Sequence, residues 1–259
     1  MIVSEKYKYV FVEQPLTAST AIASELTEYY GGREVLSKHS NYSDFLRVAT
    51  DEQRKYKVVI GVRNPLDQIV SVYQKLKTNH GNAYNNPRIY EENGGWVSKR
   101  QRNMFQYIHA EKHGFSDYFL HFFGRPRIKM NQYLWCPTRY DFVIRFERLQ
   151  SDFAEFLRLV GAEKVRDLPV VNKTAGKRDY FSYFTPDTHK TVMYVFGPVM
   201  SAWGYEAPHD WQTRNVPGAA TFQFRAMNLA ARFCIQILGM TPEKYRTLRA
   251  TIGRRSAAK

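Results

Sequence analysis

Three segments of the sequence read as a β-strand followed directly by an α-helix, and this repetition limits the possible folds more than any other feature. The strands are expected at residues 6–13, 57–63 and 141–146, where β-branched and aromatic residues are frequent. The helices are expected at residues 19–30, 64–82 and 147–161. Because strands that alternate with helices form parallel sheets, we expect an α/β fold, with ligands at the carboxyl ends of the strands.

The first junction between strand and helix, PLTAST at residues 15–20, holds small hydroxyl residues and no glycine. A helix that begins there directs free backbone N–H groups and the positive end of its dipole toward one spot, which favours a bound phosphate. The G-x-x-x-x-G-K-[ST] pattern of ordinary ATPases is absent from this segment. We therefore expect a phosphate-binding turn that is not the one of an ordinary ATPase.

The second junction, VRNPLDQIVS, predicts a second phosphate site. Arg63 ends the strand, Asn64 is expected to be the N-cap residue with Pro65 at the first helical position, and Ser71 follows two turns later. An arginine offers a planar fork of donors that suits a phosphate, and a serine hydroxyl adds one more. Two such junctions on adjacent strands indicate a ligand with two separated phosphates.

The charge of the chain also indicates an anionic partner. Lys and Arg number 38 against 24 for Asp and Glu, a net charge of +14 over 259 residues. A nucleotide, a sulfated or acidic sugar, a nucleic acid and an anionic membrane would all fit this excess, although no nucleic-acid-binding motif supports the third. The two cysteines, Cys136 and Cys234, form no C-x-x-C pair, so neither a zinc ribbon nor a disulfide scaffold is expected.

Other features are weaker. The N-terminus lacks the apolar core of a signal peptide, and no apolar run approaches the roughly 20 residues that span a bilayer, so a soluble, cytoplasmic protein is expected. His109 and His113 are spaced to share a metal ion, but H-E-x-x-H and a third ligand are missing, so no metal is expected.

The sequence predicts one main domain with two additions. The main domain spans residues 1–210, and an aromatic-rich loop-and-helix insertion at 79–135 is expected to bind the acceptor. Residues 186–205 read as one helix. Residues 211–259 form a basic extension in which one or two amphipathic helices dock on the core or on a second subunit of a homodimer; binding of a membrane surface or an acidic substrate is the alternative.

The two junctions resemble motifs of the sulfotransferases that use 3′-phosphoadenosine 5′-phosphosulfate (PAPS). Family members read P-K-T-x-[GS]-T-[ST] at the first junction and R-[DN]-P-x-x-[RQ]-x-x-S at the second. The segments DFVIRFERLQSDF and LPVVNKTAGKRDY are similar to a later strand-helix unit and to the loop that covers the nucleotide. The likeness runs from about Lys6 to Tyr205 and implies a P-loop-like α/β fold, PAPS as donor, PAP as product, and a small-molecule or saccharide acceptor.

The resemblance also implies the site residues. The chain is most similar to carbohydrate sulfotransferases of the heparan sulfate 2-O-sulfotransferase type, in which a histidine precedes H-V-S-Y-L-D-F; HSNYSDF here places the catalytic base at His39. The implied cofactor-binding residues are Leu16, Thr17, Ala18, Ser19, Thr20, Ala21, Arg63, Ser71, Lys173, Thr174, Lys177 and Arg178.

Leu16 departs from the family pattern, which has a lysine that bonds the leaving phosphate. Either another cation replaces it, with Lys177, Arg178 and Lys38 as candidates, or turnover is slow, or the protein binds PAPS without efficient chemistry. The expected function is therefore sulfuryl transfer from PAPS to a hydroxyl or amine, and the alternative is a PAPS- or PAP-binding protein with little or no activity. A kinase-like phosphotransferase is disfavoured, because the Walker lysine and a metal-binding signature are missing.

Overall fold

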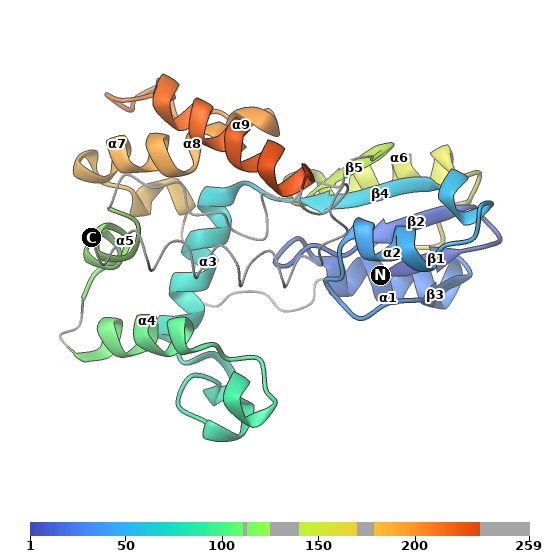
Figure 1. Ribbon diagram of the computed structural model, residues 1–259, viewed down its shortest axis with the longest axis horizontal. Helices are drawn as coiled ribbons and strands as arrows, with labels where there is room; N and C mark the ends of the chain where they lie inside the picture. The colour runs from blue at the N-terminus through green and yellow to red at the C-terminus, as the bar shows by residue number, and fades with distance from the viewer. Residues whose placement is uncertain (111–112, 125–139, 170–178, 234–259) are drawn as a thin grey trace. The chain divides into compact units, whose positions relative to one another are not determined.

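The computed structural model describes residues 1–110, 113–124, 140–169 and 179–233 (Figure 1). The chain divides into two compact units. Unit 1 comprises residues 1–63, 130–171 and 225–259, and unit 2 comprises residues 64–129 and 172–224. The predicted division into a domain at 1–210 and an extension at 211–259 stays a prediction.

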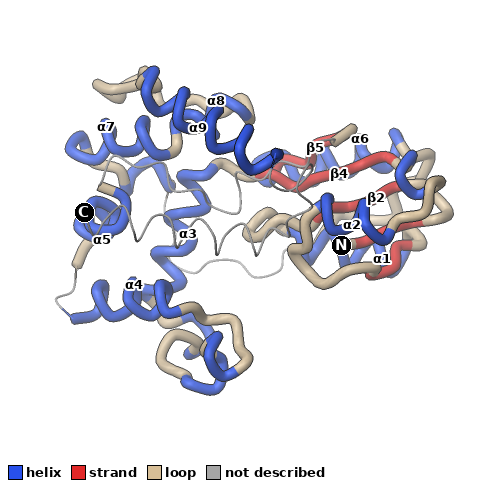
Figure 2. The backbone as a smooth tube through the Cα atoms, in the orientation of Figure 1, coloured by secondary structure: helices blue, strands red, loops and turns tan. Residues whose placement is uncertain are grey.

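The described part of unit 1 contains a five-stranded sheet with the strand order β3-β1-β2-β4-β5 (Figure 2). The strands are β1 (Ile2–Ser4), β2 (Tyr9–Val12), β3 (Gly32–Glu34), β4 (Lys57–Val62) and β5 (Phe142–Arg145). Strands β2, β4 and β5 are parallel, with Phe11 opposite Val59 and Gly61 opposite Ile144. Strand β1 is antiparallel to both β2 and β3.

The sheet is therefore mixed, and the expectation of a parallel sheet is correct for three strands and wrong for β1 and β3. Strand β1 is joined to β2 by only residues 5–8, a connection so short that the two strands must be antiparallel. Strand β3 follows α1 directly and pairs at the other edge of β1, where Gly32 opposes Ser4. A side chain at Gly32 would lie 2.8 Å from the backbone oxygen of Leu26, so this close return of the chain requires glycine.

Helices cover both faces of the sheet, and alternate strand residues face each layer. Helices α1 (Ser19–Tyr29) and α6 (Leu149–Leu159) cover one face, where Ile22, Leu26, Phe153 and Phe156 pack with Phe11 and other strand residues. Helix α2 (Tyr42–Val48) covers the other face, where Tyr42 and Phe45 pack on Val10, Val12 and Val58. The 3₁₀ helices η1 (Gln53–Lys55) and η6 (Phe146–Arg148) precede β4 and α6.

The three predicted strand-helix segments are confirmed, with shorter elements than expected. The clearest case is α3 (Pro65–Lys77), which belongs to unit 2. The Asn64 side chain caps it by accepting a hydrogen bond from the backbone N–H of Leu66 at 2.9 Å, and Pro65 stands at the first helical position. Ile69, Val70, Tyr73 and Leu76, the predicted apolar stripe, are all buried.

The described part of unit 2 is helical and contains residues 79–110 and 113–124 of the insertion that the sequence predicts as loops and helices. Its remaining elements are η2 (His80–Asn82), η3 (Pro87–Ile89), η4 (Glu91–Asn93), α4 (Lys99–Ala110), α5 (Phe115–Phe123), η7 (Tyr180–Tyr183), α7 (Pro186–Val195) and α8 (Gly197–Ala202). Aromatic rings join several of these elements: Phe115 packs edge-on against Phe184 and Tyr73. The single helix expected at 186–205 is two helices, because Gly197 and Pro198 begin a new one.

Helix α9 (Gly218–Arg232) begins in unit 2 and continues into unit 1. It falls where the sequence predicts an amphipathic helix, and residues 234–259 of the predicted extension lie outside the described residues. Of the helices in the described ranges, none combines the length and the hydropathy that a membrane span requires.

Candidate active site

In the part of the chain that the structure describes, no side-chain hydrogen bond caps the N-terminus of α1 after the turn from β2. Leu16 and Ala18 adopt left-handed backbone conformations, with φ of 64° and 60°, which non-glycine residues rarely do. Ala18 is the N-cap residue and has no side chain that could accept a hydrogen bond, and the first turn of α1 holds no acidic residue. An anion is thus the natural acceptor for the first N–H groups of this helix.

Thr17 fixes this turn to the sheet. Its hydroxyl donates to the backbone oxygen of Gln14 at 2.8 Å, and the residue is buried. Gly61 in β4 makes room for it, because a Cβ there would lie 2.7 Å from Oγ1 of Thr17. Gly61 is a site residue that the sequence reasoning missed. A glycine inside a strand pattern is the signal that could have found it, since it indicates a close approach of backbone or side chain.

Arg63 lies at the end of β4 and contacts the same turn. Its Nη1 donates to the backbone oxygen of Leu16 at 3.0 Å, and its guanidinium group lies over the ring of Phe146, 3.9 Å from the ring centre. The two contacts hold the guanidinium beside the turn, where its positive charge favours an anion.

His39 lies beside the start of the turn. Its Nδ1 is 3.0 Å from the backbone oxygen of Glu13, and because a carbonyl oxygen can only accept, Nδ1 carries the proton. The neutral ring then has its lone pair at Nε2, the arrangement of a general base. The residue adopts a left-handed conformation, with φ of 67°. Glu13 is not among the site residues that the sequence predicts. Its carboxylate is buried and pairs with the amino group of Met1 at 2.6 Å.

The environment of His39 favours its neutral form. His39 is exposed by its surface area, yet neighbouring protein atoms partly desolvate the ring and thereby lower the pKa of His39 below its usual value. The positive charge of Lys38 lowers the pKa further, whereas the hydrogen bond to Glu13 opposes both effects. The ring is therefore ready to accept a proton at neutral pH.

Lys38 brings a cation to the first turn of α1. Its Nζ donates to the hydroxyl of Thr20 at 2.7 Å. Thr20 is exposed, and Ser19 before it is buried. Of the three cations that the sequence offers as substitutes for the missing family lysine, Lys38 is the one inside the described residues.

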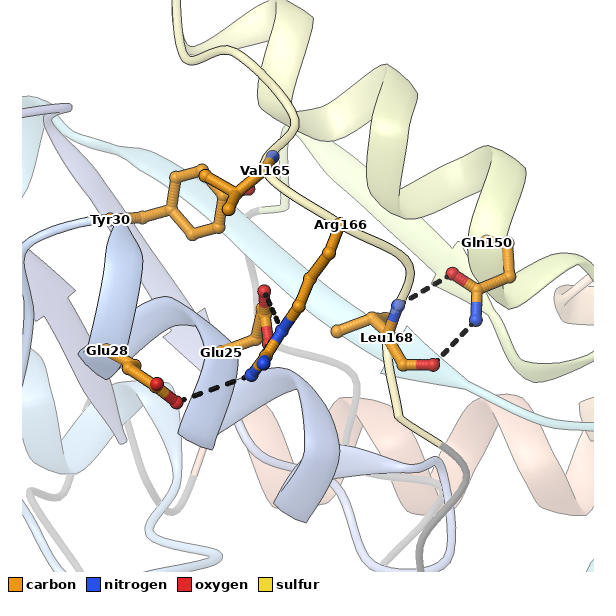
Figure 3. Close-up of polar contacts among 7 residues, drawn as sticks. All are labelled: Glu25, Glu28, Tyr30, Gln150, Val165, Arg166 and Leu168. Carbon is orange, nitrogen blue, oxygen red and sulfur yellow. Dashed lines mark hydrogen bonds and ion pairs between the residues drawn. The ribbon is translucent and has the colours of Figure 1, made fainter.

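A set of polar contacts holds α1 in place (Figure 3). Arg166, in the segment after α6, forms hydrogen bonds of 3.0–3.2 Å with the buried carboxylate of Glu25 and one of 3.4 Å with Glu28, both in α1. In the same segment, Val165 donates its N–H to the Tyr30 hydroxyl at 2.9 Å. Leu168 exchanges two hydrogen bonds with the side chain of Gln150 in α6. The segment thus connects α1 and α6 on the same face of the sheet.

The remaining predicted residues are more scattered. Ala21 is buried in α1, and Ser71 is fully buried in α3 of unit 2. Lys173, Thr174, Lys177 and Arg178 lie outside the described residues. The structure thus brings together the turn, His39 and Arg63 within unit 1, while the pairing of Arg63 with Ser71 stays a prediction.

The histidine pair of the insertion shows ordinary structural contacts. A ring nitrogen of His109, Nε2, lies 3.2 Å from the backbone oxygen of Leu76, and Nδ1 of His113 lies 4.0 Å from Asp117. In the ranges that the structure describes, no group of three or more His, Cys, Asp or Glu side chains is arranged to hold a metal ion.

Comparisons with known proteins identify the family. Nothing among the curated proteins or the solved structures matches the chain. The sequence model of the sulfotransferase family matches residues 1–195, a span that includes both strand-helix junctions, His39 and the segment 173–178. Because this match covers most of the 259 residues, the chain belongs to the sulfotransferase family.

Proposed function

We propose that this protein transfers the sulfuryl group of PAPS to a hydroxyl or amine of a small-molecule or saccharide acceptor, with His39 as the general base. The family supports sulfuryl transfer. The observation that carries the finer proposal is the hydrogen bond between Nδ1 of His39 and the Glu13 carbonyl, since it leaves the basic nitrogen of His39 beside the uncapped turn.

The reaction is an in-line displacement at sulfur. Nε2 of His39 takes the proton of the acceptor while its oxygen or nitrogen forms the new bond to sulfur. The bond from sulfur to the 5′-phosphate oxygen breaks, and its electron pair stays with PAP. We assign the stabilisation of the charge that develops on that phosphate to the first N–H groups of α1 and to the hydroxyls of Ser19 and Thr20, while Thr17, whose hydroxyl donates to Gln14, keeps the shape of the turn.

Lys38 is our candidate for the cation that the family places at position 16. A leucine side chain can neither donate a hydrogen bond nor carry charge. The Nζ of Lys38 contacts Thr20 in the first turn of α1, the same turn to which we assign the leaving phosphate. The proposed replacement comes from a different segment of the chain but carries the same charge.

The proposed site for the second phosphate, the 3′-phosphate, is based on the family motif. We assign the 3′-phosphate to Arg63 and Ser71, and further cofactor contacts to Lys173, Thr174, Lys177 and Arg178, because these positions match the family pattern. Residues 79–135 are proposed to bind the acceptor. Cytoplasmic localisation and dimerisation through the C-terminal helices also stay predictions.

The second candidate function is binding of PAPS or PAP with little or no turnover. It is favoured by Leu16, because loss of the lysine removes charge stabilisation that matters most in the transition state. Both candidate functions use the turn between β2 and α1 to bind the nucleotide. They differ in whether His39 and Lys38 participate in catalysis.

Replacing His39 separates these candidates. In a screen of saccharide and small-molecule acceptors with ³⁵S-labelled PAPS, His39→Ala should lower kcat by roughly 10²–10⁴-fold, the usual loss for a general base, with the Kd for PAP nearly unchanged. The matched control is His209→Ala, which removes an exposed histidine of unit 2 outside the segment proposed to bind the acceptor and should retain full activity.

Each other outcome has a definite meaning. Wild-type turnover by His39→Ala would contradict the assignment of the base. Binding of PAP by the wild-type protein without transfer to any acceptor would favour the binding-protein candidate. Absence of PAP binding would contradict both.

A further inference from the structure

One face of helix α9 exposes large apolar side chains to solvent. From Phe222 onward, the exposed residues of the helix and the residue after it follow the spacing of a single helical face: Phe222, Arg225, Ala226, Leu229, Ala230 and Phe233. Phe222 is 74% exposed, Leu229 71% and Phe233 52%, the first two being the largest exposures among the large apolar side chains of the described residues. Five of the six residues on this face are apolar.

The opposite face of α9 is the one that packs on the protein. Ala220 is fully buried there, and the side-chain amide of Gln223 donates to the Tyr194 hydroxyl of α7 at 2.8 Å. The apolar face therefore does not point to the core, as it would in an ordinary amphipathic surface helix. Exposed apolar stripes of this kind usually mark a contact surface.

The sequence after α9 indicates what this face meets. Residues 234–259 contain six basic residues (Lys244, Arg246, Arg249, Arg254, Arg255 and Lys259) against the single acidic residue Glu243. Arg225 adds a positive charge on the exposed face itself. An apolar helical face with basic residues on it and next to it is the pattern of a helix that lies in the surface of an anionic membrane.

A second copy of the chain is a poorer occupant. Each copy carries a net charge of +14, so two copies repel each other when they approach. An anionic bilayer, in contrast, compensates these charges and covers Phe222, Leu229 and Phe233. We propose that α9 is an interfacial helix that binds this protein reversibly to membranes containing anionic lipids.

The test is co-sedimentation of the full-length protein with lipid vesicles. Vesicles with about 30% phosphatidylserine in phosphatidylcholine should bind the wild-type protein, and vesicles of phosphatidylcholine alone should bind it far less. Leu229→Glu should lower the partition coefficient on anionic vesicles by at least about tenfold. The change removes an apolar side chain that the bilayer would bury and adds a negative charge. Raising the salt concentration should also weaken binding, because it screens the attraction to the lipid.

The matched control is Leu159→Glu, which makes the same change at an exposed leucine of α6 and should bind vesicles like the wild-type protein. Equal loss in both variants, or no vesicle binding by the wild-type protein, would overturn the proposal. Light scattering distinguishes the other occupants: a dimer that Leu229→Glu dissociates would assign the face to a second copy. A wild-type monomer that binds no vesicles would assign the face to the protein's own residues 234–259. The proposal is independent of the sulfotransferase reaction.

Discussion

Under the proposed function, Lys38 compensates for the departure at Leu16, although the two residues are distant in sequence. Leu16 and Ala18 show that the turn keeps two left-handed residues without glycine, and Lys38 reaches the helix that follows the turn. The identity of the turn residues could be read from the sequence, but their conformations could not, because asparagine and glycine are the usual signals of left-handed backbone. The contact of Lys38 with Thr20 depends on the path of the chain between α1 and α2, so no local sequence pattern predicts it.

Lys38→Met should reveal two effects at once. It should lower kcat by roughly 10²–10³-fold, as loss of one stabilising donor in the transition state does, while the Kd for PAP changes only a few-fold. It should also move the acidic limb of the pH profile to higher pH. A general base must be neutral, so activity falls as pH drops through its pKa, and Lys38 is one of the groups that lower the pKa of His39.

The measurement is kcat/KM against pH for wild-type protein, Lys38→Met and the control Lys55→Met, an exposed lysine of η1. The wild-type limb should lie below the usual histidine pKa of about 6.5. Adding Leu16→Lys to Lys38→Met should restore kcat, because the family lysine would then supply the charge. Unchanged kcat and an unmoved limb in Lys38→Met would contradict the role of Lys38.

At the scale of elements, sequence reasoning succeeded where the pattern is local. The segments that form β2-α1, β4-α3 and β5-α6 combine apolar strands with helical stripes and caps, so Asn64 and Pro65 mark the start of α3 correctly. Strands β1 and β3 were missed, because three residues carry no reliable period and their pairing joins Ile2 to Phe11 and Glu34. The contact of Gly61 with Thr17 joins two elements and likewise becomes visible only in the fold.

Gly61→Ala tests how the turn packs on β4. The new methyl group would lie 2.7 Å from the Thr17 hydroxyl, so the turn must shift, and overpacking of this kind costs about 1–3 kcal/mol. We expect a Tm lower by about 2–10 °C and weaker binding of PAP. Gly218→Ala is the control, because a Cβ at Gly218 meets no atom within 4 Å. Calorimetry that finds the two variants equally stable, with equal affinity for PAP, would show that the turn does not depend on Gly61.

At the scale of the whole molecule, we propose two anionic partners for the net charge of +14, which composition alone could not separate. One is a nucleotide with two phosphates, assigned from the strand-helix junctions and the family. The other is an anionic membrane, assigned from the exposed face of α9. The sequence predicted an amphipathic helix in this region, but which face packs on the protein is set by tertiary contacts such as that of Gln223 with Tyr194.

The central claim is that the protein binds PAPS through both of its phosphates, and thermal unfolding with PAP tests it most directly. At about 100 times its Kd, a ligand stabilises the folded protein by about 2.7 kcal/mol, which should raise the Tm by about 5–10 °C. AMP and ADP lack the 3′-phosphate and should raise the Tm far less at the same concentration. Arg63→Ala should remove most of this difference. Equal shifts with PAP, ADP and AMP, or no shift with PAP, would contradict the claim.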